Sequence, residues 1–396
     1  MLQKIRKLIP NFIVNNLWHL PIAILANLCY GFPSRKLTII GITGTSGKTT
    51  TSYLIYHLLL KANLKVALIS TILCKIGKKE IDIGLHVTNP SPFALQKMLK
   101  KIKDKGYTHL VLETTSHGLA QHRCWGINFQ YGVLTNIAHE HLDYHKTLKN
   151  YQKAKLKLIK KAKVAVINRL DPSYQLAIKA ASGRVIEFDQ SCKFISKNLI
   201  GSFNQKNISA AVAIAKDLNI PINTIKKAIS SFPGVPGRME VIQTKPFNIV
   251  IDFAHKPDAL MAALGSLRKI TKGKLISVFG CAGLRDILKR PIMGRISSKL
   301  ADITILTAED PRTESVIDIN NQIESGFIKS KTNHLYRQPD RQQAINQAIA
   351  LAKPKDTVAL FGKSHEKSIC FGTIEHPWSE HLAVKKAIKL LSKKSS

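Results

Sequence analysis

The feature that most constrains the fold is a hydrophobic run that ends in a glycine-rich loop and leads directly into a helical pattern. It spans residues 37–50, with the sequence LTIIGITGTSGKTT. A buried strand, a tight loop and a helix N-terminus in direct succession are typical of a parallel sheet whose loop N–H groups surround a phosphate. Ile42 occupies the place of the first glycine in the strict phosphate-loop pattern, and the nearby glycines are Gly41 and Gly44. We therefore predict a nucleoside triphosphate site in a variant of this loop.

The chemistry of a triphosphate assigns roles to residues in this loop and beyond it. Lys48 would neutralise the β and γ oxygens, while the Thr49 hydroxyl would ligate Mg²⁺. Glu113 follows a second predicted strand, and a carboxylate at that edge of the sheet can complete the oxygen shell of the metal. The residues predicted to contact the nucleotide through the loop are Gly44, Thr45, Ser46, Gly47, Lys48, Thr49 and Thr50.

A histidine-rich segment follows another predicted strand. His139, His141, Asp143 and His145 approach the H-x-H-x-D-H pattern of dinuclear zinc hydrolases, but Tyr144 separates the last two and a phosphate loop lies upstream. We therefore favour a site in which one of these histidines serves a second Mg²⁺ for phosphoryl transfer.

Short apolar runs alternate with helical patterns through most of the chain, which predicts α/β architecture. The expected strands are 37–42, 66–69, 109–113, 131–134 and 164–167, then 248–251, 275–279, 303–307 and 357–360. The expected helices are 48–60, 92–104, 148–161 and 204–218, then 257–269, 290–300 and 341–351. A turn-rich stretch at 232–238 separates the two series. We predict an N-terminal segment 1–35, a P-loop ATPase-type central domain 36–235 with a mostly parallel sheet, and a Rossmann-like α/β C-terminal domain 236–396.

The balance of charge excludes some classes of function. The 396 residues include 60 Lys and Arg against 25 Asp and Glu, a formal net charge of +35. The cations are spread along the chain and no nucleic-acid motif accompanies them, so we expect a basic surface that favours polyanionic small substrates and no specific nucleic-acid partner. The apolar share of 44% argues against disorder. Six scattered cysteines without a C-x-x-C pair predict reduced thiols in the cytoplasm.

The N-terminal segment combines a basic start with an apolar stretch over residues 13–32. Asparagines, a histidine and a proline interrupt the stretch, which disfavours a transmembrane span, and no small-x-small site indicates a secretory signal. Two interpretations remain open. The segment is either an amphipathic helix docked on the following domain, or a peripheral membrane contact through residues 8–32 with Trp18 at the interface, at the inner face of the membrane.

Further motifs follow the phosphate loop in a fixed order over residues 36–380. They are E-x-x-S-H at 113–117 with Gln121 and Arg123, Asn136 with H-L-D-Y-H at 141–145, G-x-F-N-x-x-N at 201–207, P-G-V-P-G-R at 233–238, D-F-A-H-x-P-D at 252–258, F-G-C-x-G-x-R-D-x-x-K-R-P at 279–291 and G-K-x-H-E at 362–366. Together with the loop, this series resembles the Mur ligases, closest to the type that adds the third peptide residue to the UDP-N-acetylmuramoyl precursor of the cell wall. The resemblance implies an ATP-dependent, ADP-forming amide ligase of peptidoglycan synthesis whose C-terminal domain is the ligase domain.

The resemblance also implies roles for individual residues. Glu113 and His141 match magnesium ligands, and Lys155 matches a lysine that the family carbamylates and uses as a metal ligand. Lys153, Lys157 and Lys160 leave the choice of that lysine open. The residues implied for catalysis are Lys48, Glu113, His141 and Lys155, and those implied for the nucleotide outside the loop are Asn204, Asn207, Arg238, Asp252 and His255. The residues implied for substrates are Thr88, Thr115, Ser116, Gln121, Arg123, Arg285, Arg312, Gly362 and Glu366.

The incoming amino acid is indicated by Glu309-Asp-Pro-Arg312. The resemblance implies that a D-N-P-R motif marks enzymes for meso-diaminopimelate, with the arginine gripping a carboxylate as a bidentate fork. Here Arg312 is present, but Glu309 and Asp310 replace Asp and Asn, and Ser364 replaces a glycine. We expect a diamino acid, diaminopimelate before L-lysine, added to a UDP-N-acetylmuramoyl-dipeptide-like acceptor.

One departure from the family leaves alternatives open. A UDP-binding domain normally precedes the phosphate loop, whereas only residues 1–40 precede it here. Folylpolyglutamate synthetases and other peptidyl ligases share the scaffold and are the second hypothesis. A non-catalytic, membrane-associated nucleotide-binding scaffold is the third. The expected reaction transfers the γ-phosphoryl group of ATP to a carboxylate, and the amine then displaces phosphate from the acyl phosphate.

Overall fold

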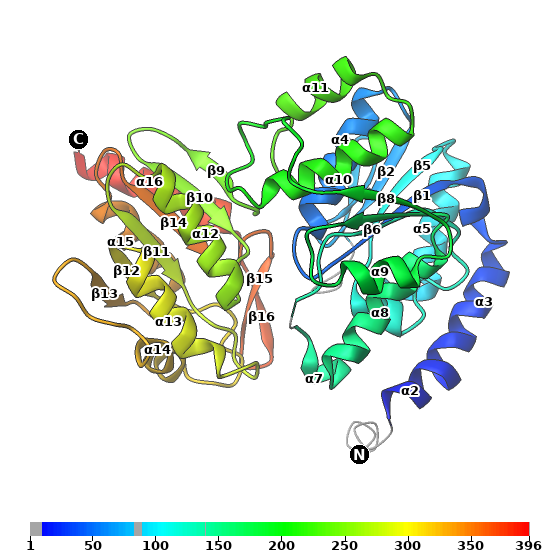
Figure 1. Cartoon of the computed structure of the whole chain (residues 1–396). Helices are drawn as coiled ribbons and strands as arrows, with labels where there is room; N and C mark the ends of the chain where they lie inside the picture. The colour runs from blue at the N-terminus through cyan, green and yellow to red at the C-terminus, as the bar shows by residue number, and fades with distance from the viewer. Residues whose placement is uncertain (1–9, 83–88, 139, 396) are drawn as a thin grey trace. The chain divides into compact units, whose positions relative to one another are not determined.

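The computed structural model describes residues 10–82, 89–138 and 140–395. The chain divides into two compact units. Unit 1 contains the chain up to residue 196 together with 203–232, and unit 2 contains 197–202 and 233–396. Each unit is built on its own α/β sheet (Figure 1).

Unit 1 contains an eight-stranded sheet in the order β4-β3-β2-β5-β1-β6-β7-β8. The strands are β1 (Thr38–Thr43), β2 (Val66–Ile69), β3 (Cys74–Ile76), β4 (Lys79–Ile81), β5 (His109–Glu113), β6 (Phe129–Leu134), β7 (Val164–Asn168) and β8 (Arg184–Phe188). All neighbouring pairs are parallel except β2–β3 and β3–β4. β3 and β4 are three residues each and β8 is half-exposed, so their sequences lack the buried apolar run that identifies the other five.

Helices cover both faces of this sheet (Figure 1). They are α2 (Asn11–Val14), α3 (Leu20–Tyr30), α4 (Lys48–Lys61), α5 (Pro92–Asp104), α6 (Ser116–Ala120), α7 (Leu142–His145), α8 (Leu148–Lys161), α9 (Tyr174–Ala180), α10 (Asn204–Asp217) and α11 (Ile222–Ser230), with a π-helix η1 (Asn15–His19) and a 3-10 helix η2 (Pro33–Lys36). On one face α5 and α8 pack Leu99 and Leu158 into a core with Ile39 and Leu110. On the other face α4 and α10 pack against each other.

The N-terminal helices dock on unit 1 along one side only. α3 packs against α5, and its buried Asn27 donates to the carbonyl of Trp125 at 2.9 Å. The opposite side exposes Leu17, Trp18 and Leu28 by 61–74%. Residues 11–30 are, within the described chain, the one helical stretch with the length and mean hydropathy (1.4) of a membrane span.

Unit 2 contains a six-stranded sheet in the order β13-β12-β11-β14-β10-β9, which is parallel except for β9. Its strands are β9 (Glu240–Gln243), β10 (Asn248–Asp252), β11 (Leu275–Phe279), β12 (Ile303–Leu306), β13 (His334–Arg337) and β14 (Thr357–Phe361), and a separate hairpin joins β15 (Ser368–Phe371) to β16 (Ile374–Pro377). Its helices are α12 (Pro257–Ile270), α13 (Lys289–Leu300), α14 (Val316–Glu324), α15 (Arg341–Leu351) and α16 (Glu380–Ser395). One core joins α12, α13 and α14 to the sheet, and a second joins α15 and α16 to it.

Candidate active site

The loop between β1 and α4 is held in a fixed shape by the strand next to it. Asn136, after β6, accepts from the N–H of Ser46 at 2.9 Å and donates back to its carbonyl at 3.0 Å. Gly44 has φ 155°, and a Cβ at this position would come within 1.8 Å of the Thr135 hydroxyl. Gly47 has φ 82° and precedes the first residue of α4. The loop is thus preorganised as a backbone cradle at a helix N-terminus, where an anion is stabilised.

The loop lysine lies over this cradle. Lys48 Nζ donates to the carbonyls of Gly44 at 2.9 Å and Thr45 at 3.0 Å. Thr45 is fixed in turn by Tyr151 of α8, with 2.9 Å between their hydroxyls. Burial raises the pKa of Tyr151 to about 12, so this phenol stays protonated and remains a hydrogen-bonding group.

Glu113 lies at the end of β5, beside the first turn of α4. Its Oε1 accepts from the Thr49 hydroxyl at 3.1 Å and the Thr71 hydroxyl at 2.8 Å, and Oε2 accepts from the Thr71 N–H at 3.1 Å. The carboxylate is 1% exposed and has no ion-pair partner in the described part of the chain. A buried carboxylate beside hydroxyl oxygens fits the hard oxygen ligands that Mg²⁺ requires.

Lys155 extends from α8 to the same loop. It is 1% exposed, and its Nζ donates to the Gly44 carbonyl at 2.6 Å and lies 4.7 Å from the centre of the Tyr151 ring. Burial, followed by repulsion from Lys48, holds its pKa well below the ordinary value of lysine. Of the four lysines considered for this role, Lys155 is the buried one, while Lys153 and Lys160 are exposed.

His141 belongs to an aromatic cluster near the loop. It is exposed, adopts φ 54° at the start of α7, and its ring centre lies 4.9 Å from that of His117. His117 also packs on Tyr144 at 4.4 Å and His145 at 5.4 Å. His139 lies outside the described residues. Among the described residues no group of three or more His, Cys, Asp and Glu has the arrangement of a metal cluster.

Asn204 and Asn207 open α10 beside the phosphate loop. Asn207 donates to the side-chain oxygen of Asn204 at 2.9 Å and accepts from the Thr51 hydroxyl at 3.2 Å. Its amide oxygen would lie 2.4 Å from a Cβ at Gly47. These two asparagines therefore adjoin the loop, and Thr50 is buried in the first turn of α4.

The residues implied for the acceptor form a connected group around Asn89. Its Oδ1 accepts from the Thr115 N–H at 2.8 Å and hydroxyl at 2.9 Å, and its carbonyl accepts from Arg123 at 2.5 Å. Arg123 also donates to the Gln121 side chain at 2.9 Å. Ser116 is buried with no partner for its hydroxyl in the described chain. Thr88 lies outside the described residues.

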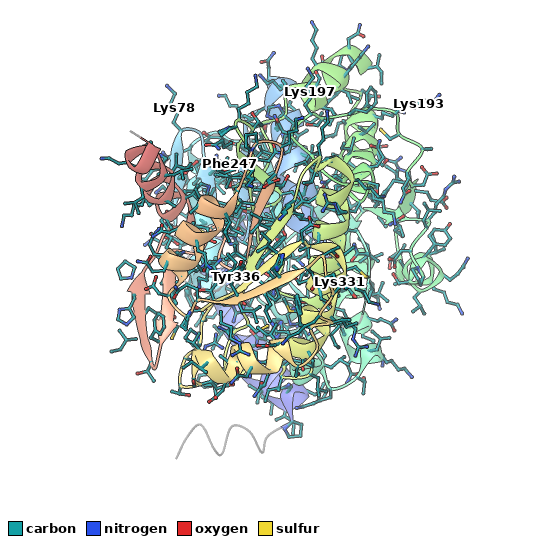
Figure 2. All side chains as sticks on the ribbon, turned by 90° about the vertical axis from the view of Figure 1, so that its left-hand side faces the viewer. Lys78, Lys193, Lys197, Phe247, Lys331 and Tyr336 are labelled. Atoms are coloured by element: carbon teal, nitrogen blue, oxygen red, sulfur yellow. The ribbon has the colours of Figure 1, made fainter. Side chains whose placement is uncertain are left out.

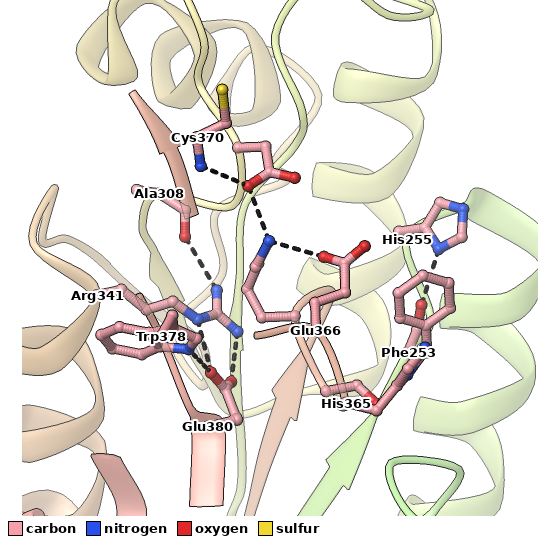
Figure 3. A network of polar contacts seen from close by, with 12 residues as sticks. Phe253, His255, Ala308, Arg341, His365, Glu366, Cys370, Trp378 and Glu380 are labelled. Carbon is pink, nitrogen blue, oxygen red and sulfur yellow. Dashed lines mark hydrogen bonds and ion pairs between the residues drawn. The ribbon is translucent and has the colours of Figure 1, made fainter. Parts of the chain in front are cut away.

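Unit 2 gathers a second set of predicted residues at the ends of β10 and β14. Asp252 is buried and accepts from the N–H groups of Met239 at 2.7 Å and Ala254 at 2.8 Å, and burial raises its pKa. The Arg238 guanidinium stacks on Phe253, 4.5 Å from the ring centre. His255 donates from Nδ1–H to the Phe253 carbonyl at 2.8 Å, and burial lowers the pKa of the imidazole to about 4, so it is neutral at pH 7 (Figure 3).

The residues implied for the amino acid surround a buried lysine that the sequence left unassigned. Lys363 forms ion pairs with Asp310 at 2.8 Å and Glu366 at 2.7 Å (Figure 3). Gly362, at φ 100°, lies against the side chain of Glu309, whose Oε2 is buried without a partner in the described chain. Burial raises the pKa of Glu309. The site therefore places the carboxyl groups of Asp310, Glu366 and Glu309 near Lys363, and a second buried lysine, Lys289, also acts on Glu309.

The two arginines implied for substrates differ in their surroundings. Arg312 adopts φ 53° and donates from its guanidinium to the Gly283 carbonyl at 2.6 Å, while its N–H bonds to the carbonyl of Cys370. Arg285 is exposed on the loop after β11 and carries no hydrogen bond among the described residues.

The sequence analysis assigned no site role to four residues of these sites, namely Asp310, Lys363, Thr71 and Asn89. Lys363 stands inside the quoted motif G-K-x-H-E, but Thr71 and Asn89 carry no signal in a single sequence because their partners are distant along the chain.

Two domains of one protein family match the chain. The Mur ligase middle domain matches residues 42–193, and the Mur ligase glutamate ligase domain matches residues 237–364. The UDP-N-acetylmuramoyl-L-alanyl-D-glutamate–2,6-diaminopimelate ligase of Clostridium botulinum is 38% identical over 376 residues, with 87% of this chain and 76% of the relative covered. The enzyme of the same name from Aquifex aeolicus is 37% identical over 385 residues, with 91% and 79% covered.

Solved structures give the same picture of the fold. A structure of a UDP-N-acetylmuramoyl-L-alanyl-D-glutamate–2,6-diaminopimelate ligase superposes with a TM-score of 0.64 at 30% identity, covering 91% of this chain and 79% of that one. E. coli FolC in complex with ADP gives a TM-score of 0.71 at 19% identity and covers 95% of both chains. The second likeness concerns the fold alone.

Proposed function

The chain belongs to the Mur ligase family, and from this premise we propose that it adds meso-diaminopimelate to a UDP-N-acetylmuramoyl-dipeptide through an acyl phosphate. The family membership confirms the resemblance drawn from the motifs and the predicted α/β fold class. The chain is an ATP-dependent, ADP-forming ligase of peptidoglycan precursor synthesis. The identity of acceptor and amino acid, and the role of each residue, are the proposed part.

The observation that carries the proposal is the buried contact of Glu113 with Thr49 at the phosphate loop. In the proposed mechanism the loop N–H groups and Lys48 bind the β and γ phosphates of ATP. Thr49 and Glu113 would hold Mg²⁺, with His141 beside a second ion, and the metal would supply charge stabilisation for the phosphoryl group. The peptide carboxylate attacks the γ phosphorus and ADP leaves; the amine then attacks the acyl carbon and phosphate leaves, so that one amide forms for each ATP.

Carbamylation of Lys155 is part of the proposal. An amine must be neutral to attack CO₂, and the lowered pKa of Lys155 favours the neutral form. The reaction joins the amine nitrogen to the carbon of CO₂ and releases one proton, which leaves a carboxylate on the side chain. Such a carboxylate would become a further oxygen ligand for a metal at the loop, beside the buried Glu113.

The choice of diaminopimelate rests on unit 2 and on the relatives. Arg312 keeps a guanidinium where a distal carboxylate would bind, and Glu366 and Glu309 offer carboxyl oxygens to a distal ammonium. Curated relatives that are 37–38% identical carry the name of diaminopimelate ligases. L-lysine is the second candidate, because Asp310 adds a negative charge near the site.

A single assay tests the proposed function. The protein is incubated with ATP, Mg²⁺, UDP-N-acetylmuramoyl-L-alanyl-D-glutamate and either diaminopimelate, L-lysine or L-glutamate, and both phosphate and the new amide are measured. We expect product with diaminopimelate, and loss of turnover in Lys48→Ala. Product with glutamate on a folate acceptor alone would favour the folylpolyglutamate alternative, and turnover without ATP consumption would overturn the mechanism.

Peripheral membrane contact through residues 8–32 is a separate part of the proposal. It is supported by the exposed apolar side of the described helices, where Leu17, Trp18, Leu25 and Leu28 are 53–74% exposed. The chain has no acidic residue before Glu80, so this end of the protein complements an anionic lipid surface. Such contact would hold the ligase at the inner face of the membrane.

A further inference from the structure

A basic cluster lies on unit 1 where the turn after α6 meets α8. Lys157 Nζ donates to the Leu119 carbonyl at 3.4 Å, so this side chain lies against the end of α6. Lys161 follows one helical turn later on the same face of α8. His122, at φ 55°, lies in the turn itself. Repulsion from Lys157, Lys161 and His19 disfavours the charged form of its imidazole.

The N-terminal helices are fixed to this turn. Asn27 donates to the Trp125 carbonyl at 2.9 Å, and its amide fills the space over Gly126. The Ser34 hydroxyl donates to the Gly126 carbonyl at 3.2 Å. His19, the last residue of the π-helix η1, therefore lies near the cluster on a segment that is anchored to it.

Three cations at this turn have no carboxylate partner within the described part of the chain. Neither Arg123, Lys157 nor Lys161 pairs with a carboxylate anywhere in the described residues. Burial, followed by repulsion from Lys157, Lys161 and His19, lowers the pKa of His122 to about 4. Like charges four residues apart on a helix repel each other, so a bound anion would stabilise this arrangement.

The basic cluster adjoins the residues that are proposed to bind the acceptor. Arg123, beside His122, bonds to Gln121 and to the Asn89 carbonyl. Lys155 donates to the phosphate loop, and Lys157 follows it by two positions. The side chains of these two lysines therefore project from different faces of α8. A helix with its side chains is about 10–12 Å across, a span that the sugar of a nucleotide-linked acceptor can bridge.

We propose that Lys157, Lys161, His122 and His19 bind the diphosphate that is joined to the muramoyl sugar of the acceptor. The acceptor's peptide carboxylate then lies at the phosphate loop while unit 1 and its N-terminal helices hold the charged end of the same molecule. This inference rests on the proposed function, because it concerns the acceptor of that reaction. The chemistry recognised is a sugar diphosphate, whether its other end carries uridine or a polyprenyl chain.

The test compares acceptors that differ only in the diphosphate. Ligation rates are measured for wild type and for Lys157→Gln/Lys161→Gln with UDP-N-acetylmuramoyl-dipeptide, its polyprenyl-diphosphate counterpart and the N-acetylmuramoyl-dipeptide without phosphate. We expect the double variant to raise KM at least tenfold for both diphosphate acceptors, with unchanged KM for the phosphate-free acceptor and unchanged kcat. Lys153→Gln/Lys160→Gln, on exposed positions of the same helix, is the matched control and should leave all three KM values unchanged.

Two results would overturn the inference. One is an equal rise in KM for the phosphate-free acceptor, which would indicate a general effect on the site. The other is wild-type KM values in the double variant. If the wild type ligates none of the acceptors, the proposed function fails, and direct titration with uridine diphosphate at saturating ADP decides the present inference alone. Binding that is lost in the double variant supports it, and binding that is retained, or absent from the wild type, contradicts it.

Discussion

At Gly44 of the phosphate loop the surrounding atoms leave no space for a side chain. A Cβ at Gly44 would lie 1.8 Å from the Thr135 hydroxyl, in a backbone conformation that L-residues rarely adopt. We expect Gly44→Ala to lower the free energy of unfolding by about 2–4 kcal/mol and to abolish ADP binding, since the loop must shift. Urea denaturation and ADP titration check this. Gly106→Ala, with a positive φ but open space, isolates the backbone strain and should retain ADP binding.

The buried amine of Lys155 gives a prediction on CO₂ and pH. Lys155→Ala should reduce ligation at least a hundredfold, and added acetate or formate should restore part of the rate by replacing the lost carboxylate. In the wild type, activity should fall when CO₂ is removed. Because the pKa of Lys155 is lowered, the neutral amine is present from a lower pH than for an ordinary lysine, and reactivation by bicarbonate should extend to that lower pH. Wild-type turnover in Lys155→Ala would contradict the carbamate.

The residues that could be predicted are those whose chemistry is local. The loop 44–49 was predictable because strand, glycines and helix follow one another directly. Glu113 and Lys155 followed from position within motifs. Thr71 and Asn89 were missed, since each acts through a partner 42 or 26 positions away, a pairing that depends on the register of the sheet. The structure brings Glu113 and Lys155 to the loop, but their roles, like those of His141 and the other site residues, stay predictions.

Secondary-structure elements of unit 2 are joined by a buried ion pair. Arg341, the first residue of α15, donates to Glu380, the first residue of α16, at 2.5 and 3.0 Å, and Trp378 donates to the same carboxylate (Figure 3). Arg341→Ala should cost about 3–5 kcal/mol of unfolding free energy, because it leaves a buried charge unpaired. Arg337→Ala, which removes an exposed pair with Glu324, should cost about 0–1 kcal/mol. Equal costs in chemical denaturation would contradict this account.

The N-terminal helices give a prediction on lipid binding. Leu17→Glu/Trp18→Glu should reduce the fraction bound to phosphatidylglycerol vesicles about tenfold or more, since each exposed apolar side chain contributes roughly 1.5–3 kcal/mol when buried. Flotation measures the bound fraction. Ile374→Glu alters an equally exposed residue of the β15–β16 hairpin and should bind as wild type. Equal binding to uncharged phosphatidylcholine vesicles would remove the electrostatic part of the proposal.

The elements themselves were predicted best where burial is complete. The strands β1, β2, β5, β11 and β14 are buried along their length, and the apolar runs predicted them within about two residues. β3 and β4, by contrast, exist because β2 offers an edge to pair with, so their three-residue sequences indicate nothing alone. The apolar pattern of 13–32 did not distinguish docking from membrane contact, and the structure gives the segment both a docked and an exposed side.

The whole molecule carries a strong positive field. Exposed lysines are found on both units, and Figure 2 labels Lys78, Lys193, Lys197 and Lys331 among them. With a net charge of +35, the protein should attract ATP and a nucleotide-linked acceptor from solution. Raising the ionic strength from about 0.01 M to 0.15 M shortens the screening length from about 30 to 8 Å. The KM for ATP and the KM for the acceptor should therefore rise several-fold, while kcat stays constant. Initial rates measure this; KM values that do not respond to salt would contradict it.

The path of the chain constrains how the molecule can be dissected. Residues 197–202 belong to unit 2, although the residues on either side of them belong to unit 1, and Ile200 packs against the core that α12, α13 and α14 share. A fragment that ends at residue 232 would therefore contain residues 197–202, which pack in unit 2. A fragment that starts at residue 233 would lack these residues, including Ile200 of its hydrophobic core. Two separately expressed fragments divided between residues 232 and 233 should therefore fail to restore activity in a complementation assay, unless residues 197–202 are added to the second fragment.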